Sequence, residues 1–255
     1  MTFTLDFLPQ AAFAFFLIFA RMGAMSMALP GIGDRTVPPR IRLVFALTLS
    51  FIFYPLVDRL FPALPTSLFG MISAMIGEAL VGLAIGFSVR IVISALQFAG
   101  TTIAFQTGLA FAQNVDPSNG TQSSLFGAFL SMLSVALIFA TDLHHLLLTA
   151  MHDSYSLFRP GSLLPTGDLA EVAVRTVTSS FRVAIQLAGP FLAFGMIFYL
   201  GIGILSRLIP QVHVFFLAMP LNIMLGMLLF MLLLATFMYW FLDYFAGAIE
   251  PFLAG

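Results

Sequence analysis

The side chains best suited to binding a metal or moving a proton lie between Asp142 and Asp153. This stretch contains His144, His145 and His152. On a helix, His145 and His152 are separated by roughly 10 Å along the axis, too far for both imidazoles to hold one ion as an i,i+4 pair does. The same geometry places Asp142, His145 and His152 on one face and directs His144 away from it. The pattern therefore favours a polar helix end in which Asp142 orients His145, and no metal site.

Glu78 is a single carboxylate inside an otherwise apolar segment. A charge at the centre of a membrane helix costs roughly 2.5 to 3.5 kcal/mol on insertion scales. Steps of four residues place small residues on its helix face, namely Gly70, Ala74, Gly82 and Gly86. Such a row lets a neighbouring backbone approach closely, so Glu78 is expected to point into a helix interface. The alternative is a carboxylate on a proton or ion pathway.

Residues 31–34 read Gly-Ile-Gly-Asp and match the Gly-x-Gly-Asp motif of intramembrane aspartyl proteases. That chemistry needs two carboxylates sharing a proton, and the only earlier acid is Asp6. Asp34 is also followed by a polar, proline-containing stretch, so a turn is favoured over a protease site. The chain has no cysteine, which removes thiolate metal sites and thiol nucleophiles. It also has no Walker loop, so it hydrolyses no nucleotide by itself.

The composition indicates whether the surface of the chain faces water or lipid. Of its 255 residues, 60% are hydrophobic and 8% charged, against about 25% charged in soluble domains. This excludes a water-soluble enzyme and predicts contact with membrane lipid. All ten basic residues are Arg and the net charge is −1, so there is no basic patch for nucleic acid.

Apolar windows of about 20 residues with at most one charge mark helices that could cross a membrane. We predict an all-α membrane protein with about six hydrophobic helices in a single domain over residues 1–255. The N-terminal window is expected to be retained, because residues 1–7 lack the basic residue of a signal peptide. Residues 168–186 are predicted to form an amphipathic helix. Arginines counted in the predicted loops divide four to five between the two sides, so they set no orientation. The windows are 7–27, 42–57 (the weakest), 67–87, 124–140, 183–205 and 212–241.

Residues 100–123 are polar but uncharged as far as Asp116. Irregular backbone at membrane depth is tolerated only inside protein or beside water, so this segment could line or block a pathway. An ordinary surface loop with a turn over residues 116–120 is the alternative.

Five groups of residues, in order along the chain, resemble the FliR family of flagellar type III export gate components, which is similar to the injectisome family SctT. They are Arg21 with Pro30-Gly31, Val37-Pro38 and Arg40; Glu78 with Gly82 and Gly86; Gly100 with Gln106-Thr107-Gly108 and Asp116-Pro117; residues 141–145 (Thr-Asp-Leu-His-His) with Ser154-Tyr155; and residues 207–211 (Arg-Leu-Ile-Pro-Gln) with Pro220-Leu221.

The resemblance implies a subunit of a hetero-oligomeric export gate built of helical hairpins, and neither an enzyme nor a cofactor-binding protein. Its partners would be FliP, FliQ and FlhB-like proteins in the bacterial inner membrane at the flagellar basal body, with unfolded flagellar subunits in transit. The segment 106–122 would be a plug that closes the channel. Its expected residues are Gln106, Gly108, Phe111, Asp116, Pro117 and Gly120. Expected helix or subunit contacts are Arg21, Glu78, Gly82, Gly86, Asp142, His145, Arg207 and Pro210.

A different class of function remains as the alternative. A stand-alone secondary transporter would use Glu78 as a midplane site together with a broken helix around Pro190, Gly201 and Gly203.

Overall fold

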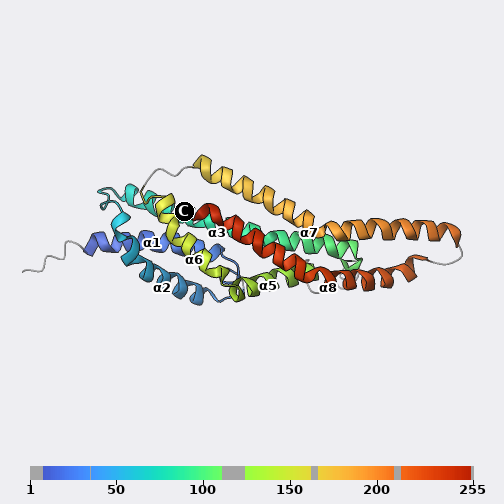
Figure 1. Cartoon of the computed structure of the whole chain (residues 1–255). Coiled ribbons are helices and arrows are strands. Elements are labelled where there is room, and N and C mark those ends of the chain that lie inside the picture. Colours follow the sequence, from blue (N-terminus) through green and yellow to red (C-terminus); the bar gives the residue numbers. More distant parts are fainter. Residues whose placement is uncertain (1–7, 35, 111–123, 162–165, 210–213, 254–255) are drawn as a thin grey trace, which may run out of the picture. The chain divides into compact units, whose positions relative to one another are not determined.

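The computed structural model of the chain describes residues 8–34, 36–110, 124–161, 166–209 and 214–253. Over these residues the regular structure consists of helices alone, as predicted (Figure 1). The α-helices are α1 (Leu8–Ala28), α2 (Pro39–Val57), α3 (Leu68–Gln106), α5 (Leu125–Ala140), α6 (Leu143–Leu157), α7 (Thr166–Leu208) and α8 (Val214–Ile249), and the 3-10 turns are η2 (Asp58–Leu60) and η4 (Glu250–Phe252).

Five helices are long and apolar enough to cross a membrane, and α5 with α6 gives a sixth if this bent pair counts as one span. The predicted number of hydrophobic helices is thus confirmed, but three predicted lengths are wrong. α3, α7 and α8 have 39, 43 and 36 residues, nearly twice a bilayer span. Charged side chains do not end these helices, since Arg90 lies within α3 and Arg182 within α7.

The predicted amphipathic helix and the apolar window at 183–205 are one continuous helix, α7. Within it the ion pair from Arg175 Nη2 to Glu171 Oε1 (2.5 Å) forms at the spacing of one helical turn. Pro190 lies inside α7 and does not interrupt it. The broken helix of the transporter alternative is therefore wrong.

The described chain divides into two compact units. Unit 1 comprises Met1–Val92, Ile138–Thr176 and Ala246–Gly255, and unit 2 comprises Ile93–Leu137 and Val177–Phe245. The helices α3, α7 and α8 each contribute residues to both units.

In unit 1, α1 contacts both α2 and the following 3-10 turn η2. Apolar side chains from α1, α2, α3 and α6 are buried in its core, while other large apolar side chains of the same helices, such as Phe51 of α2 and Phe69 of α3, are exposed. Helices that are apolar all round are typical of membrane proteins. The most deeply buried side chains include Leu17, Ile18, Met22, Ala46, Ile85 and Met151.

Unit 2 has an aromatic core. The Phe126 and Phe230 rings lie 4.5 Å apart, and Phe191 lies 6.5 Å from Phe230 and 6.1 Å from Phe237. α3 and α5 also meet through glycines, since a Cβ atom on Gly100 would collide with the Gly127 backbone. Such a contact brings two helix backbones closer than larger residues allow.

Candidate functional sites

The first candidate site is a buried ion pair in unit 1. Arg21 of α1 donates from Nε to Oε2 of Glu78 in α3 at 2.6 Å, and the two side chains are 1% and 4% exposed. A buried charge is tolerated only when it is paired and its remaining hydrogen-bonding groups are satisfied. Both partners of this pair were named from the sequence, and the structure brings them together.

The rest of the Arg21 guanidinium is held by the C-terminal end of α6. Nη1 donates to the Ser154 carbonyl at 2.8 Å, and Nη2 donates to the Phe158 carbonyl, also at 2.8 Å. The ring of Tyr155 lies under the guanidinium, 4.2 Å from Cζ to the ring centroid. A cation is favourable at a helix C-terminus, where carbonyl groups lack partners within the helix. Arg21 therefore joins α1, α3 and the end of α6.

Two glycines allow α3 to approach α1 at this site. A Cβ atom on Gly82 would collide with the Arg21 carbonyl, and one on Gly86 would lie 2.6 Å from Ala28 Cβ and 2.8 Å from the Met25 carbonyl. Glu78 reaches Arg21 because these glycines permit close approach. Because the Glu78 carboxylate is buried and paired with Arg21, it is not a free midplane site of the kind that the transporter alternative needs.

The second candidate site lies in unit 2, where α3 ends. Asn222 of α8 is buried and donates from Nδ2 to the Gln106 carbonyl at 3.1 Å. Gly108, two residues later, has a φ of +75°, a left-handed conformation that glycine adopts without penalty. Asn222 thus holds the last turn of α3 at the point where the chain changes direction.

Two more glycines pack against this turn. A Cβ atom on Gly195 of α7 would collide with the Gln106 side-chain oxygen, and one on Gly226 of α8 would collide with the Thr107 side chain. Thr107 is buried and its hydroxyl donates to the Ile103 carbonyl at 2.9 Å. The end of α3 is therefore enclosed by α7 and α8.

The predicted plug begins in a helix rather than in a loop. Gln106 is the last residue of α3, so the expectation of irregular backbone from residue 100 onward is wrong up to this point. Among the other expected contact residues, Arg207 is exposed in the last turn of α7. Phe111, Asp116, Pro117, Gly120 and Pro210 lie outside the described residues.

The polar cluster after α5 differs from the expected geometry. Asp142 has a φ of 60°. His145 Nδ1 lies 3.2 Å from the Asp142 carbonyl oxygen and 3.8 Å from Asp142 Oδ1. The prediction that His144 points away is wrong, because its ring lies 4.2 Å from that of His145. Adjacent side chains on a regular helix point about 100° apart around the axis. His144 and His145, however, lie in the first turn of α6, directly after the left-handed Asp142. Asp142 and His145 are exposed.

Asp34 forms a turn, as the sequence favoured. Its Oδ2 accepts a hydrogen bond from the Gly31 amide at 3.0 Å, and Gly31 has a φ of 84°. The carboxylate is half exposed and lies 3.8 Å from Arg90 Nη2. This arrangement satisfies a local turn.

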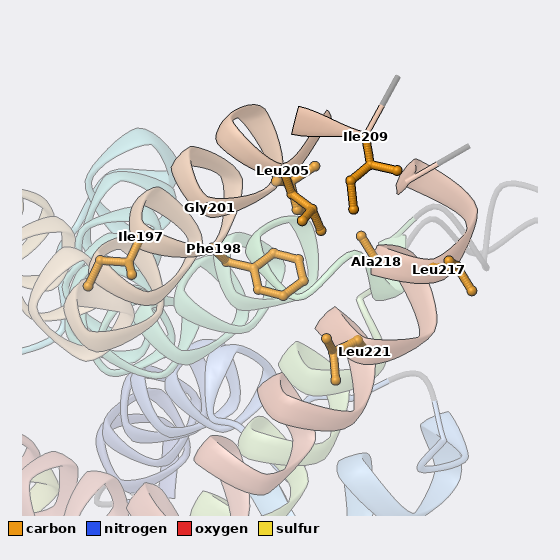
Figure 2. A pocket seen from close by; sticks show the side chains of 9 residues that line it. Ile197, Phe198, Gly201, Leu205, Ile209, Leu217, Ala218 and Leu221 are labelled. Carbon is orange, nitrogen blue, oxygen red and sulfur yellow. The ribbon is translucent and has the colours of Figure 1, made fainter. Parts of the chain in front are cut away.

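An apolar pocket of about 560 Å³ lies in unit 2 between the end of α7 and the start of α8 (Figure 2). Phe198, Leu205 and Leu221 are among its lining residues, all of which are apolar. The pocket therefore offers no side chain for acid–base chemistry or metal binding.

Sequence reasoning missed several of the residues that build these sites. Asn222 interrupts an apolar run of 30 residues, and a polar amide in such a run is itself a signal of a buried contact. Tyr155 and Ser154 were visible only as part of a motif. Their role depends on α6 ending beside Arg21, which no local pattern specifies.

Comparison with known proteins gives the family. The family model described as bacterial export proteins, family 1, matches residues 12–248. The flagellar biosynthetic protein FliR of Caulobacter vibrioides is 44% identical over 219 residues, which cover 86% of this chain and 87% of the relative. FliR of Bacillus subtilis is 34% identical over 82% of each chain, and FliR of Escherichia coli K12 is 27% identical over 81% of this chain and 78% of its own. The chain therefore belongs to the FliR family of flagellar biosynthetic proteins and is a membrane component of the flagellar export apparatus.

Proposed function

We propose that the chain is a noncatalytic subunit of the gate through which unfolded flagellar proteins cross the bacterial inner membrane. It would assemble with FliP, FliQ and FlhB-like proteins at the flagellar basal body. Family membership supports a role in the export apparatus. The named partners and the inner-membrane position rest on the resemblance of the motifs described above.

Within this gate, residues 106–122 act as the plug. The observation that carries this assignment is the partly buried hydrogen bond from Asn222 Nδ2 to the Gln106 carbonyl. It fixes the first residue of the segment to α8, while Gly108 lets the chain turn away from α3. A plug needs such a fixed base.

The chemistry of the segment suits a reversible closure. Residues 106–115 carry no charge, so displacement by a passing polypeptide breaks no ion pair in this stretch. A neutral hydrogen bond contributes about 0.5 to 1.5 kcal/mol, which holds the anchor without making it permanent. The enclosing glycines, Gly195 and Gly226, keep the base of the plug in place during such movement.

Shortening the segment between Gly108 and Gly120 tests the plug directly. The shortened chain should assemble with its partners and make cells leak small ions, measured by loss of membrane potential or by uptake of a small impermeant solute. Unchanged permeability in a complex shown by purification to be assembled would contradict the plug assignment.

The anchor is tested by Asn222→Ala, which removes the donor to the Gln106 carbonyl. A smaller leak than that of the shortened chain is expected, because the plug remains but its base is loosened. Ser206→Ala on α7 is the matched control, since its hydroxyl donates only within its own helix, to the Gly203 carbonyl at 2.9 Å. It should leave permeability unchanged.

A further inference from the structure

Asp142, His144 and His145 gather where the chain passes from α5 to α6. One ligand atom from each lies within 4.8 Å of the other two. We propose that these three side chains bind a divalent first-row transition ion of the Zn²⁺ or Ni²⁺ type. Two imidazoles and one carboxylate are donors that such ions prefer, and this site is separate from both sites described above.

The Asp142 carboxylate does not cap α6, although an acid at this position usually does. Asp142 precedes the first residue of α6, but its side chain makes no capping hydrogen bond to the helix. Its backbone is left-handed, which is uncommon for a residue other than glycine. The side chain lies near His145, whose Nδ1 is 3.8 Å from Asp142 Oδ1.

His144 supplies the second ligand and an independent indication of a missing partner. Its Nδ1 is buried and has no hydrogen-bond partner among the described residues. Leaving a buried polar atom without a partner is unfavourable. The ring is held between Phe139, with centroids 5.1 Å apart, and His145, at 4.2 Å. Coordination through Nδ1 would supply the absent partner.

The geometry needs only a small closure to bind an ion. Zinc–nitrogen bonds of about 2.0 to 2.1 Å place tetrahedral ligand atoms about 3.4 Å apart, so the three donors must approach by up to roughly 1.5 Å. The side chains of Asp142 and His145 are 79% and 68% exposed and can rotate to do so. The fourth position is open to water.

The electrostatics of the site also permit a cation. The first turn of a helix disfavours positive charge by about 0.3 to 1 kcal/mol. The Asp142 carboxylate compensates for this term because it is itself a ligand with a full negative charge. A bound ion would link Asp142, which precedes α6, with the first turn of α6, and would fix the start of that helix.

The test is a titration of the purified full chain in detergent, carried on a tag without histidine, with Zn²⁺ and a competing chromophoric indicator. One ion per chain with a dissociation constant in the micromolar range is expected. His144→Ala, His145→Ala and Asp142→Asn should each weaken binding roughly tenfold or more. His152→Ala is the matched control on the same helix, where His152 Nδ1 pairs with Asp153 Oδ1 at 2.9 Å, and should change affinity less than twofold.

Two results would overturn the proposal. One is an absence of stoichiometric binding to the unaltered chain below about 100 µM Zn²⁺. The other is binding that none of the three variants weakens. X-ray absorption of the zinc-loaded chain needs no variant, so it decides the question even if a substitution prevents folding. Scattering from two imidazoles at about 2.0 Å supports the site, and a shell without imidazole refutes it.

Discussion

At the scale of single residues, Arg21 and Glu78 depend on each other. Replacing either one by Ala leaves a buried charge without its partner, which costs about 3 to 5 kcal/mol. We expect both single variants to lower the free energy of unfolding by this amount, measured by SDS-induced unfolding of the purified chain in mixed micelles.

The double variant Arg21→Met, Glu78→Leu should lose less than the sum of the single changes, because apolar residues of similar size leave no unpaired charge. It should not recover fully, since the Phe158 carbonyl loses the donor Arg21 Nη2, and the Ser154 carbonyl keeps only the Phe158 amide. The control is Arg90→Ala, which removes a half-exposed pair with Asp34 at 3.8 Å and should cost no more than about 1 kcal/mol. If the single Arg21 and Glu78 variants each lowered the free energy of unfolding by less than about 1 kcal/mol, and the double variant by their sum, the ion pair would contribute little to stability.

How far the sequence predicts such contacts depends on the kind of signal. Glu78 was identifiable because a charge in an apolar run needs a partner, and its row of glycines indicated a close helix. The partner itself lies 57 positions away, and helical spacing says nothing about residues on different helices. The same limit explains why His144 was misplaced, since regular helical angles do not apply beside a left-handed residue such as Asp142.

At the scale of helices, the close contact of α1 with α3 is testable through glycine. Gly86→Ala would place a Cβ atom 2.8 Å from the Met25 carbonyl, and a backbone atom cannot move aside as a flexible side chain does. We expect destabilisation of about 1 to 3 kcal/mol, the range for overpacked cores, measured as a lower midpoint of thermal unfolding in detergent.

Gly247→Ala in α8 is the matched control, because a Cβ atom there has nothing within 4 Å. Alanine favours a helix by up to about 1 kcal/mol over glycine, so this variant should be neutral or slightly more stable. Equal destabilisation by both changes would contradict a specific contact at Gly86.

Helix type was predictable from hydrophobicity, but helix length was not. The predicted windows at 67–87 and 183–205 stop before the next Arg, whereas the folded helices continue past it. Arginines counted as loop residues accordingly lie in helices, with Arg90 in α3 and Arg175, Arg182 and Arg207 in α7.

At the scale of the whole molecule, the long helices exceed the membrane. The 43 residues of α7 correspond to about 65 Å of helix, and the hydrocarbon core is only about 30 Å thick. We expect roughly 20 successive positions of α7 to lie in lipid and the others outside it. Because the chain has no cysteine, single cysteines report this without background.

The measurement is labelling of the chain in vesicles by a water-soluble maleimide, at exposed α7 positions such as Val174, Ile185, Met196 and Leu208. A protected window with a reactive region beside it is expected. Ala184→Cys and Leu187→Cys, which are fully buried, serve as controls and should react only after denaturation. Protection at every exposed position would show that all of α7 is shielded.

The sequence positions of the Arg21 partners also determine when each contact can form during translation. Ribosomes make Arg21 before its partners: the carboxylate of Glu78 follows 57 residues later, and the carbonyls of Ser154 and Phe158 follow 133 and 137 residues later. At about 5 to 20 residues per second, the last of these emerges on the order of 10 s after Arg21. For that interval the nascent chain carries a guanidinium whose final partners do not yet exist. The contacts that fix α1 are therefore complete only after the end of α6 has been made.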